Sequence, residues 1–207
     1  MKITLTLDGF TKDYYIDFLI NGGVIIETKT AETLTAAHKA QVLNYIFLCG
    51  LHHATLLNFR PERVQHEFVS TQLTPADRHR ISWTTTKWKP MSAACEVLQK
   101  TLNHALTDWG SCLDPNLYRD VITHFLGGEE KVVHEIELRS KYGSLGMQKV
   151  HHLTNDIAFS VTSSVHRPDI VLEHHTRFLR HTSLHAIQWI NLNRQRITLH
   201  TILRDTE

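Results

Sequence analysis

The chain has 207 residues, of which 42% are hydrophobic and 21% are charged, and its formal net charge is +1. The composition is that of an ordinary globular protein with one large or two small domains, and the charge excludes an overall basic field for nucleic-acid binding. Any contact with nucleic acid must come from a local patch. Three widely spaced cysteines, without a C-x-x-C motif, support neither a disulfide framework nor a zinc site. We find no signal peptide or membrane-spanning run and expect a cytoplasmic protein.

The start of the chain predicts strands joined by two turns. Apolar and polar residues alternate over residues 1–7, and Asp8-Gly9 is a turn signal before a second strand. Residues 14–20 and 24–30 are rich in aromatic and β-branched side chains. Between them, Asn21-Gly22-Gly23 supplies residues that tolerate positive φ, as a tight turn requires. This segment therefore predicts a β-hairpin.

A hairpin centred on Gly22 pairs Asp17 with Glu27 on neighbouring strands and places Lys29 on the same face. Two opposed carboxylates repel each other, and a divalent cation such as Mg²⁺ or Mn²⁺ would reverse that penalty. A lysine beside such a metal could position water or stabilise charge on a phosphate. An ordinary solvated strand face is the alternative, because Glu-x-Lys is a common tripeptide.

Helical periodicity follows the hairpin. The predicted helix begins at an N-cap threonine, Thr33 or Thr35, and ends at Gly50. Gln41 and Tyr45 lie four residues apart, so they share one face of this helix.

The rest of the chain predicts more strands and helices. Residues 52–59 and 64–69 read as two further strands, which gives an α/β layer built on one sheet. Residues 72–90 are polar and contain two prolines, so we expect a linker there. Residues 91–106 and 116–126 predict two helices.

The second half of the chain repeats the pattern of the first. Residues 41–69 align with residues 174–202 without a gap, at an offset of 133 residues. The apolar pattern survives at this offset, whereas each residue with proposed chemistry is replaced. Glu27 corresponds to Ser160, Lys29 to Thr162, Gln41 to His174 and Tyr45 to Phe178, and with a small gap Asp17 corresponds to His151. Chance similarity between two sheet-and-helix segments is the alternative.

The ordered set of Asp17, Glu27-x-Lys29 on the next strand and Gln41-x-x-x-Tyr45 on the following helix resembles the PD-(D/E)XK nuclease superfamily. It is most similar to the RecB-like branch and to the small bacterial GxxExxY proteins, and the resemblance covers residues 1–70. The resemblance implies that Asp17 and Glu27 bind Mg²⁺ or Mn²⁺. It also implies that Lys29 positions water or stabilises the transition state, and that Gln41 and Tyr45 orient the site or contact the nucleic-acid backbone.

The resemblance further implies a restriction-endonuclease-like α/β fold, a mixed sheet flanked by helices, duplicated here with a degenerate second copy. We expect a nuclease-like core over residues 1–71, a linker over 72–90 and the second copy over 91–207. In GxxExxY proteins a helix that carries the name motif precedes the first strand, whereas here Met1 already stands at that strand. In the segment before the second copy, Pro115 occupies the place of the motif glutamate.

Two functions follow from these observations. The first is a Mg²⁺-dependent nuclease that hydrolyses phosphodiester bonds in DNA. The second is a catalytically inactive nuclease-like protein that acts in nucleic-acid binding or protein assembly, which the short N-terminus and the proline favour. We expect nucleic acid, DNA first, as the partner, no membrane contact, and a homodimer or an intramolecular pseudo-dimer. Unless they are part of a solvated linker, the candidate contacts to phosphates and bases are Arg60, Arg63, Arg78, Arg80, Lys87, Lys89, Trp83 and Trp88.

Overall fold

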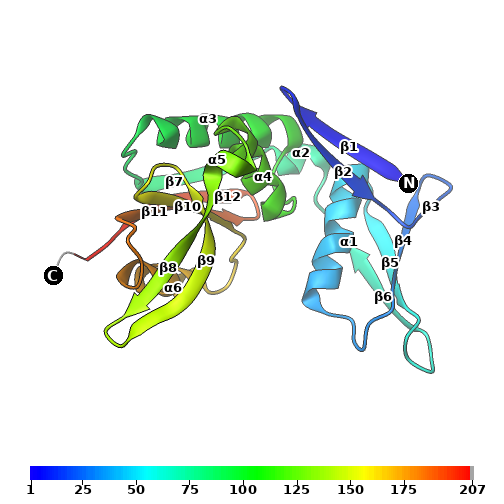
Figure 1. Ribbon diagram of the computed structural model, residues 1–207. Coiled ribbons are helices and arrows are strands. Elements are labelled where there is room, and N and C mark those ends of the chain that lie inside the picture. The colour runs from blue at the N-terminus through cyan, green and yellow to red at the C-terminus, as the bar shows by residue number, and fades with distance from the viewer. Residues whose placement is uncertain (206–207) are drawn as a thin grey trace. The chain divides into compact units, whose positions relative to one another are not determined.

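The computed structural model describes residues 1–205 and divides into two compact units (Figure 1). The N-terminal unit comprises residues 1–80 and 112–114, and the C-terminal unit comprises residues 81–111 and the chain from Pro115 onward. Both units are mixed α/β structures, which confirms the fold class predicted from the sequence. Among the described residues, no helix is both long enough and apolar enough to cross a membrane.

The N-terminal unit contains a two-stranded hairpin and a four-stranded sheet with strand order β3-β4-β5-β6. Its strands and helices are β1 (Lys2–Leu7), β2 (Phe10–Tyr15), β3 (Phe18–Ile20), β4 (Val24–Lys29), α1 (Ala36–Cys49), β5 (His53–Asn58), β6 (Gln65–Ser70) and α2 (Pro75–Arg78). Strands β1 and β2 form the hairpin, and β4 pairs in parallel with β5 while the other neighbours are antiparallel. Because a parallel pair needs a crossover, α1 connects β4 to β5.

Local sequence signals set the boundaries of these elements. Asn21 and Gly22 take positive φ, 48° and 66°, so the turn forms as predicted and Ile20 pairs with Val24. Of the two candidate N-caps, Thr35 is the one that caps α1, and Gly50 ends the helix with a φ of 65°.

Helix α1 covers one face of the four-stranded sheet. Val42, Tyr45 and Ile46 of α1 pack with Ile25 of β4 and Leu56 of β5 in a core whose members are almost fully buried. Side chains alternate between faces along a strand, so every second residue of β4, counted from Ile25, faces α1.

The C-terminal unit is built on a six-stranded sheet with strand order β7-β12-β11-β10-β9-β8. Its elements are β7 (Ser82–Lys87), α3 (Ala93–Trp109), α4 (Pro115–Phe125), α5 (Glu129–Val132), β8 (Val133–Ser140), β9 (Gly143–His152), β10 (Ile157–Thr162), α6 (Pro168–Arg180), β11 (Ala186–Asn193) and β12 (Arg196–Leu203). Helix α6 connects β10 to β11, which are parallel.

Helices lie on both faces of this six-stranded sheet (Figure 1). On one face, Phe178 of α6 packs against a core that includes Ile187 and Trp189 of β11. On the other face, the fully buried Gln188 donates from Nε2 to Sγ of Cys95 in α3, at 3.5 Å. Successive side chains of β11 therefore contact helices on both faces of the sheet.

The polar segment over residues 72–90 is more structured than a linker. It contains α2 and β7, and β7 pairs in parallel with β12 at the edge of the C-terminal sheet. The backbone N–H of Lys89 donates to Oγ1 of Thr201 at 2.7 Å, and Nε1 of Trp88 donates to Oε1 of Gln99 at 3.1 Å. Pro75 is the first residue of α2 and Pro90 lies between β7 and α3, so neither proline interrupts an element.

The two units share a strand arrangement at the offset seen in the sequence. Strands β9-β10-β11-β12 follow the same order and directions as β3-β4-β5-β6. The register is the same as well: Ile25 pairs with Ala54 in the first sheet, and Ala158 pairs with Ile187 in the second. The aligned residues 53–58 and 65–69 thus lie at the same strand positions as residues 186–191 and 198–202. His151 corresponds to Phe18 and not, as the sequence predicts, to Asp17, because Phe18 pairs with Ile26 as His151 pairs with Phe159.

Candidate metal and catalytic site

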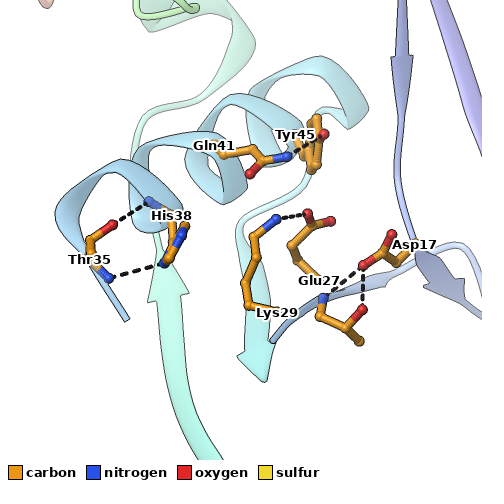
Figure 2. A network of polar contacts seen from close by, with 8 residues as sticks. Asp17, Glu27, Lys29, Thr35, His38, Gln41 and Tyr45 are labelled. Atoms are coloured by element: carbon orange, nitrogen blue, oxygen red, sulfur yellow. Dashed lines mark hydrogen bonds and ion pairs between the residues drawn. The ribbon is translucent and has the colours of Figure 1, made fainter. Parts of the chain in front are cut away.

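Glu27 and Lys29 form an ion pair on the face of β4 that α1 covers. They follow Ile25 at intervals of two residues, so they project from the same face as this core residue. Lys29 Nζ lies 2.6 Å from Glu27 Oε1 (Figure 2), and the Glu27 residue is only 3% exposed. The sequence thus places a carboxylate and an ammonium inside an otherwise apolar layer.

The second carboxylate oxygen of Glu27 has no protein partner. Oε2 is buried and accepts no hydrogen bond from any described residue. A buried, unsatisfied polar atom is costly, and a buried carboxylate oxygen costs more because it carries charge. The pair with Lys29 compensates only Oε1. Oε2 is therefore an unsatisfied acceptor. A hard cation such as Mg²⁺ or Mn²⁺ is a ligand that would satisfy it.

Asp17 lies just before β3, at the corner where the chain passes from β2 to β3. Its Oδ2 accepts hydrogen bonds from the backbone N–H of Thr28 at 2.8 Å and from Thr28 Oγ1 at 2.6 Å. The Thr28 hydroxyl lowers the pKa of the Asp17 carboxyl most, and the Thr28 amide and the Lys29 ammonium lower it further. The sequence predicts that Asp17 pairs with Glu27 between two strands, whereas β3 begins one residue later, at Phe18.

Figure 2 shows Asp17, Glu27 and Lys29 gathered at the end of β4, beneath α1. Two carboxylates are a usual protein contribution to a Mg²⁺ site, since this ion keeps several waters and takes further ligands from a substrate phosphate. In the described part of the chain, no group of three or more His, Cys, Asp or Glu side chains is placed to hold a metal. Asp17 and Glu27 are thus the two carboxylates that a metal at this site could use.

Gln41 and Tyr45 lie on the face of α1 that is turned toward the sheet. Gln41 Nε2 donates to the Tyr45 hydroxyl at 2.8 Å, as their spacing of four residues allows. Tyr45 is 6% exposed and belongs to the same core as Ile25. Figure 2 shows this pair opposite the Glu27–Lys29 pair, so all four residues line the layer between α1 and β4.

The loop after Lys29 is held by a buried asparagine. Asn58, at the end of β5, is fully buried; its Oδ1 accepts from the backbone N–H of Ala31 at 3.0 Å, and its Nδ2 donates to the Ala31 carbonyl at 2.8 Å. Asn191 makes the same two contacts with Ser164, at 2.8 and 3.0 Å, at the equivalent place in the C-terminal unit. Sequence reasoning assigned no role to Asn58 or to Thr28. The recurrence of Asn at the offset of 133 was the available signal.

The positions of the C-terminal unit that correspond to Glu27, Lys29 and Tyr45 carry Ser160, Thr162 and Phe178, which have no charge. Thr162, which corresponds to Lys29, accepts from Nε1 of Trp189 at 2.8 Å and donates to Oδ1 of Asn191 at 3.1 Å. At the offset of 133, Ser160 corresponds to Glu27 and Phe178 to Tyr45. The described contacts of Thr162 stay inside the unit, and neither Ser160 nor Thr162 supplies a carboxylate or a cation.

Several basic residues expected to contact phosphates have other contacts. Arg78 is 7% exposed, donates from Nη1 to the Phe47 carbonyl at 2.9 Å and stacks over the Phe47 ring. Arg60 pairs with Glu32 at 3.2 Å, and Arg80 pairs with an aspartate on α2 at 3.0 Å. Arg78 therefore stabilises the fold. Arg60 and Arg80 form surface ion pairs, in which a phosphate can take the place of the carboxylate.

The first part of the chain matches a known family. Residues 1–70 match the family model of the PD-(D/E)XK nuclease superfamily. The match covers the hairpin, the four-stranded sheet and α1, and it includes all five residues assigned to the site from the sequence. The mixed sheet with its crossover helix agrees with a restriction-endonuclease-like fold. No curated protein and no solved structure matches the chain.

Proposed function

We propose that the N-terminal unit is the catalytic part of a divalent-metal-dependent nuclease that hydrolyses phosphodiester bonds in DNA. The observation that carries the proposal is the buried Glu27 carboxylate, whose Oε2 is unsatisfied beside Lys29 and Asp17. A fold gains nothing in stability from such an atom, whereas a metal site needs it. The family match over residues 1–70 supports the same assignment.

In this proposal Glu27 Oε2 and the Asp17 carboxylate hold Mg²⁺ or Mn²⁺. The metal, when bound, polarises the phosphate and lowers the pKa of a bound water. Asp17 is suited to the role because its depressed pKa keeps it ionised, and both of its described hydrogen bonds use Oδ2. Phosphoryl transfer then depends mainly on positioning and on charge stabilisation, which side chains fixed in a packed layer provide.

Lys29 acts in this proposal as the cation nearest the reacting phosphate. Its ammonium has three donors, and the bond to Glu27 Oε1 uses one of them. Two donors are left for a phosphate oxygen and for the attacking water. Gln41 and Tyr45 hold each other in one orientation, and we assign them to positioning of the water or of the nucleic-acid backbone.

We further propose that the C-terminal unit is a second, degenerate copy of the first. Equal strand order, equal register and the shared asparagine contacts at Asn58 and Asn191 support this view. Ser160 and Thr162 stand where Glu27 and Lys29 stand in the first unit, so each chain would carry one catalytic site. The second copy would then serve nucleic-acid binding or assembly, which also defines the runner-up function should the first site be inactive.

The proposal is tested by metal binding and cleavage on matched variants. Mn²⁺ is titrated into the full chain by calorimetry, and linear single- and double-stranded DNA are incubated with Mg²⁺ or Mn²⁺. Glu27→Gln should abolish both metal binding and cleavage, and Asp17→Ala should weaken binding at least tenfold. Glu67→Gln is the matched control, because Glu67 is a carboxylate on β6 paired with Lys39 of α1. Absence of any metal binding by the wild type, together with absence of cleavage, would overturn the nuclease and leave the binding or assembly function.

A further inference from the structure

The four-stranded sheet of the N-terminal unit has a second face, opposite α1, which is apolar and open. One row of paired residues crosses it from edge to edge: Phe18, Ile26, Thr55 and Phe68. The two edge residues are strongly exposed, Phe18 by 56% and Phe68 by 80%. The apolar side chains of this open face are Phe18, Ile20, Val24, Ile26, Leu57 and Phe68. Thr28, His53, Thr55, His66 and Ser70 share the face, which carries no Asp, Glu, Lys or Arg of these strands.

The sequence pattern explains why this face is open. Along β4, Ile25 and Glu27 point toward α1, so Val24 and Ile26 point the other way. Helix α1 is the crossover from β4 to β5 and can cover only one side. Within the described residues of the N-terminal unit, no helix packs over Phe18 or Phe68, as their exposure shows. A contiguous apolar patch of this kind on a protein surface is often an interaction site.

The C-terminal unit shows what covers the same face of an equivalent sheet. In register, the row Phe18, Ile26, Thr55 and Phe68 corresponds to His151, Phe159, Gln188 and Thr201. The last three of these are at most 8% exposed. Gln188 Nε2 and Thr201 Oγ1 both donate to the carbonyl of Lys89, and Gln188 also reaches Cys95 of α3. The cover is therefore helix α3 with the residues just before it, joined by α4 over β10.

The size of the open face also favours a helix over a second copy of the sheet. Four strands span about 19 Å and six residues about 20 Å, at ~4.8 Å per strand and ~3.3 Å per residue. The face thus measures at most roughly 400 Å², about half of the ~800 Å² that each partner buries in a standard protein interface. An α-helix of about 13 residues is also about 20 Å long.

We propose that the open face binds an amphipathic α-helix of a partner protein, in the position that α3 takes on the C-terminal sheet. The helix presents apolar side chains at i, i+3, i+4 and i+7 to Phe18 and Phe68 and keeps its polar side in solvent. Because the contacts are with apolar side chains and the face carries no Asp, Glu, Lys or Arg of these strands, binding should depend only weakly on salt. This separates the proposal from nucleic-acid binding, whose affinity falls steeply with salt. It rests on the exposed row and on the C-terminal comparison, and it stands whether or not the chain cleaves DNA.

The test uses the full chain and a fluorescent peptide with the sequence of residues 92–110, which contains α3. Anisotropy titrations compare the wild type with the double variant Phe18→Ser/Phe68→Ser. The matched control is Tyr142→Ser, which removes an aromatic residue of 88% exposure from the C-terminal unit. Thermal melts confirm that all three proteins fold, which their surface positions favour.

Saturable binding by the wild type, at least tenfold weaker in the double variant, unchanged in the control and little changed by added salt, supports the proposal. No binding at millimolar peptide overturns it, and so does binding that the double variant retains. Sedimentation gives a further outcome: a dimer that Phe68→Ser converts to a monomer would assign the face to a second copy of the chain and overturn the helix proposal.

Discussion

Removing Lys29 tests the energetics of the site without reference to catalysis. The change Lys29→Met keeps most of the side-chain volume but leaves the Glu27 carboxylate without its cation. The Glu27 side chain is 4% exposed and its Oε2 already lacks a partner, so the carboxylate would lose its last described contact. Breaking a buried ion pair from one side costs about 3–5 kcal/mol. The Lys29 side chain is 19% exposed, so water can reach the site, and we expect about 2–3 kcal/mol.

The assay is thermal unfolding followed by far-UV circular dichroism in metal-free buffer. For a unit of this size, about 4–8 °C is lost per kcal/mol, so the N-terminal unit should melt roughly 10–20 °C lower in Lys29→Met. Glu27→Gln/Lys29→Met should recover most of this loss, because no charge is left in the layer. The matched control is Lys39→Met, whose pair with Glu67 is 50% and 36% exposed and should contribute at most about 1 kcal/mol.

The effect of Mn²⁺ on melting and the cleavage of DNA are measured on the same variants. Added Mn²⁺ should raise the melting temperature of Lys29→Met at least as much as that of the wild type, since the cation binds only the folded state. The double variant should fold and still fail to cleave DNA, which separates stability from chemistry. A Lys29→Met protein that melts within 2 °C of the wild type would refute the reasoning, because Glu27 would then not depend on its partner.

Three further predictions concern residues around and beyond this pair. Asp17→Asn should cost roughly 0.5–1 kcal/mol at pH 7 in an exposed position, because Thr28 and Lys29 stabilise the ionised form. Since the pKa of Asp17 is lowered in the folded protein, the difference should begin to shrink as the pH falls below about 4, the ordinary value of an aspartate, and should be lost below the folded value. The sequence predicts the opposite sign, from repulsion with Glu27, so urea melts at pH 7 and 3 decide between the two. Asn58→Ala should lower the free energy of unfolding by about 2–4 kcal/mol, because the backbone N–H and carbonyl of Ala31 lose their partner. Asn191→Ala should cost a similar amount in the C-terminal unit. A loss below 1 kcal/mol in chemical denaturation would contradict the assigned contacts. Burial, together with the nearby His174, lowers the pKa of His175 to about 4. The unfolded chain therefore binds the proton more readily, and the free energy of unfolding should fall by at most about 3 kcal/mol from pH 6.5 to 4. A His175→Phe protein with the same pH dependence of its melting temperature would exclude His175 as the cause of this loss.

Local signals were sufficient for most of the N-terminal unit. The turn at Asn21-Gly22 and the cap residues Thr35 and Gly50 act over a few residues, so the sequence alone specifies them. The same holds for the shared face of Gln41 and Tyr45, which needs only the period of a helix.

Longer-range pairing decided what the sequence did not show. Asp17 leaves the predicted strand because the preceding Ile16 pairs with Met1, where its backbone N–H donates to the Met1 carbonyl at 2.8 Å. An extrapolation with a period of two cannot detect that break. Strand β7 is similar: its six residues are all exposed and show no apolar alternation, yet the strand pairs with β12 more than a hundred residues later. This polar segment is a strand because it pairs with the edge of the sheet, and not because of its own side-chain pattern.

The contrast between the two units bears on why Glu27 is present. Equivalent backbone positions hold a buried Glu27 in one sheet and Ser160 in the other, while the strand order and register stay the same. The fold therefore does not require a carboxylate there, and a neutral side chain satisfies it at lower cost. A carboxylate that destabilises this layer, beside a lysine that only partly compensates it, supports the proposal that Glu27 is present to hold a ligand. That argument holds for Glu27 alone among the buried carboxylates of the described chain, because no other Asp or Glu in it is buried.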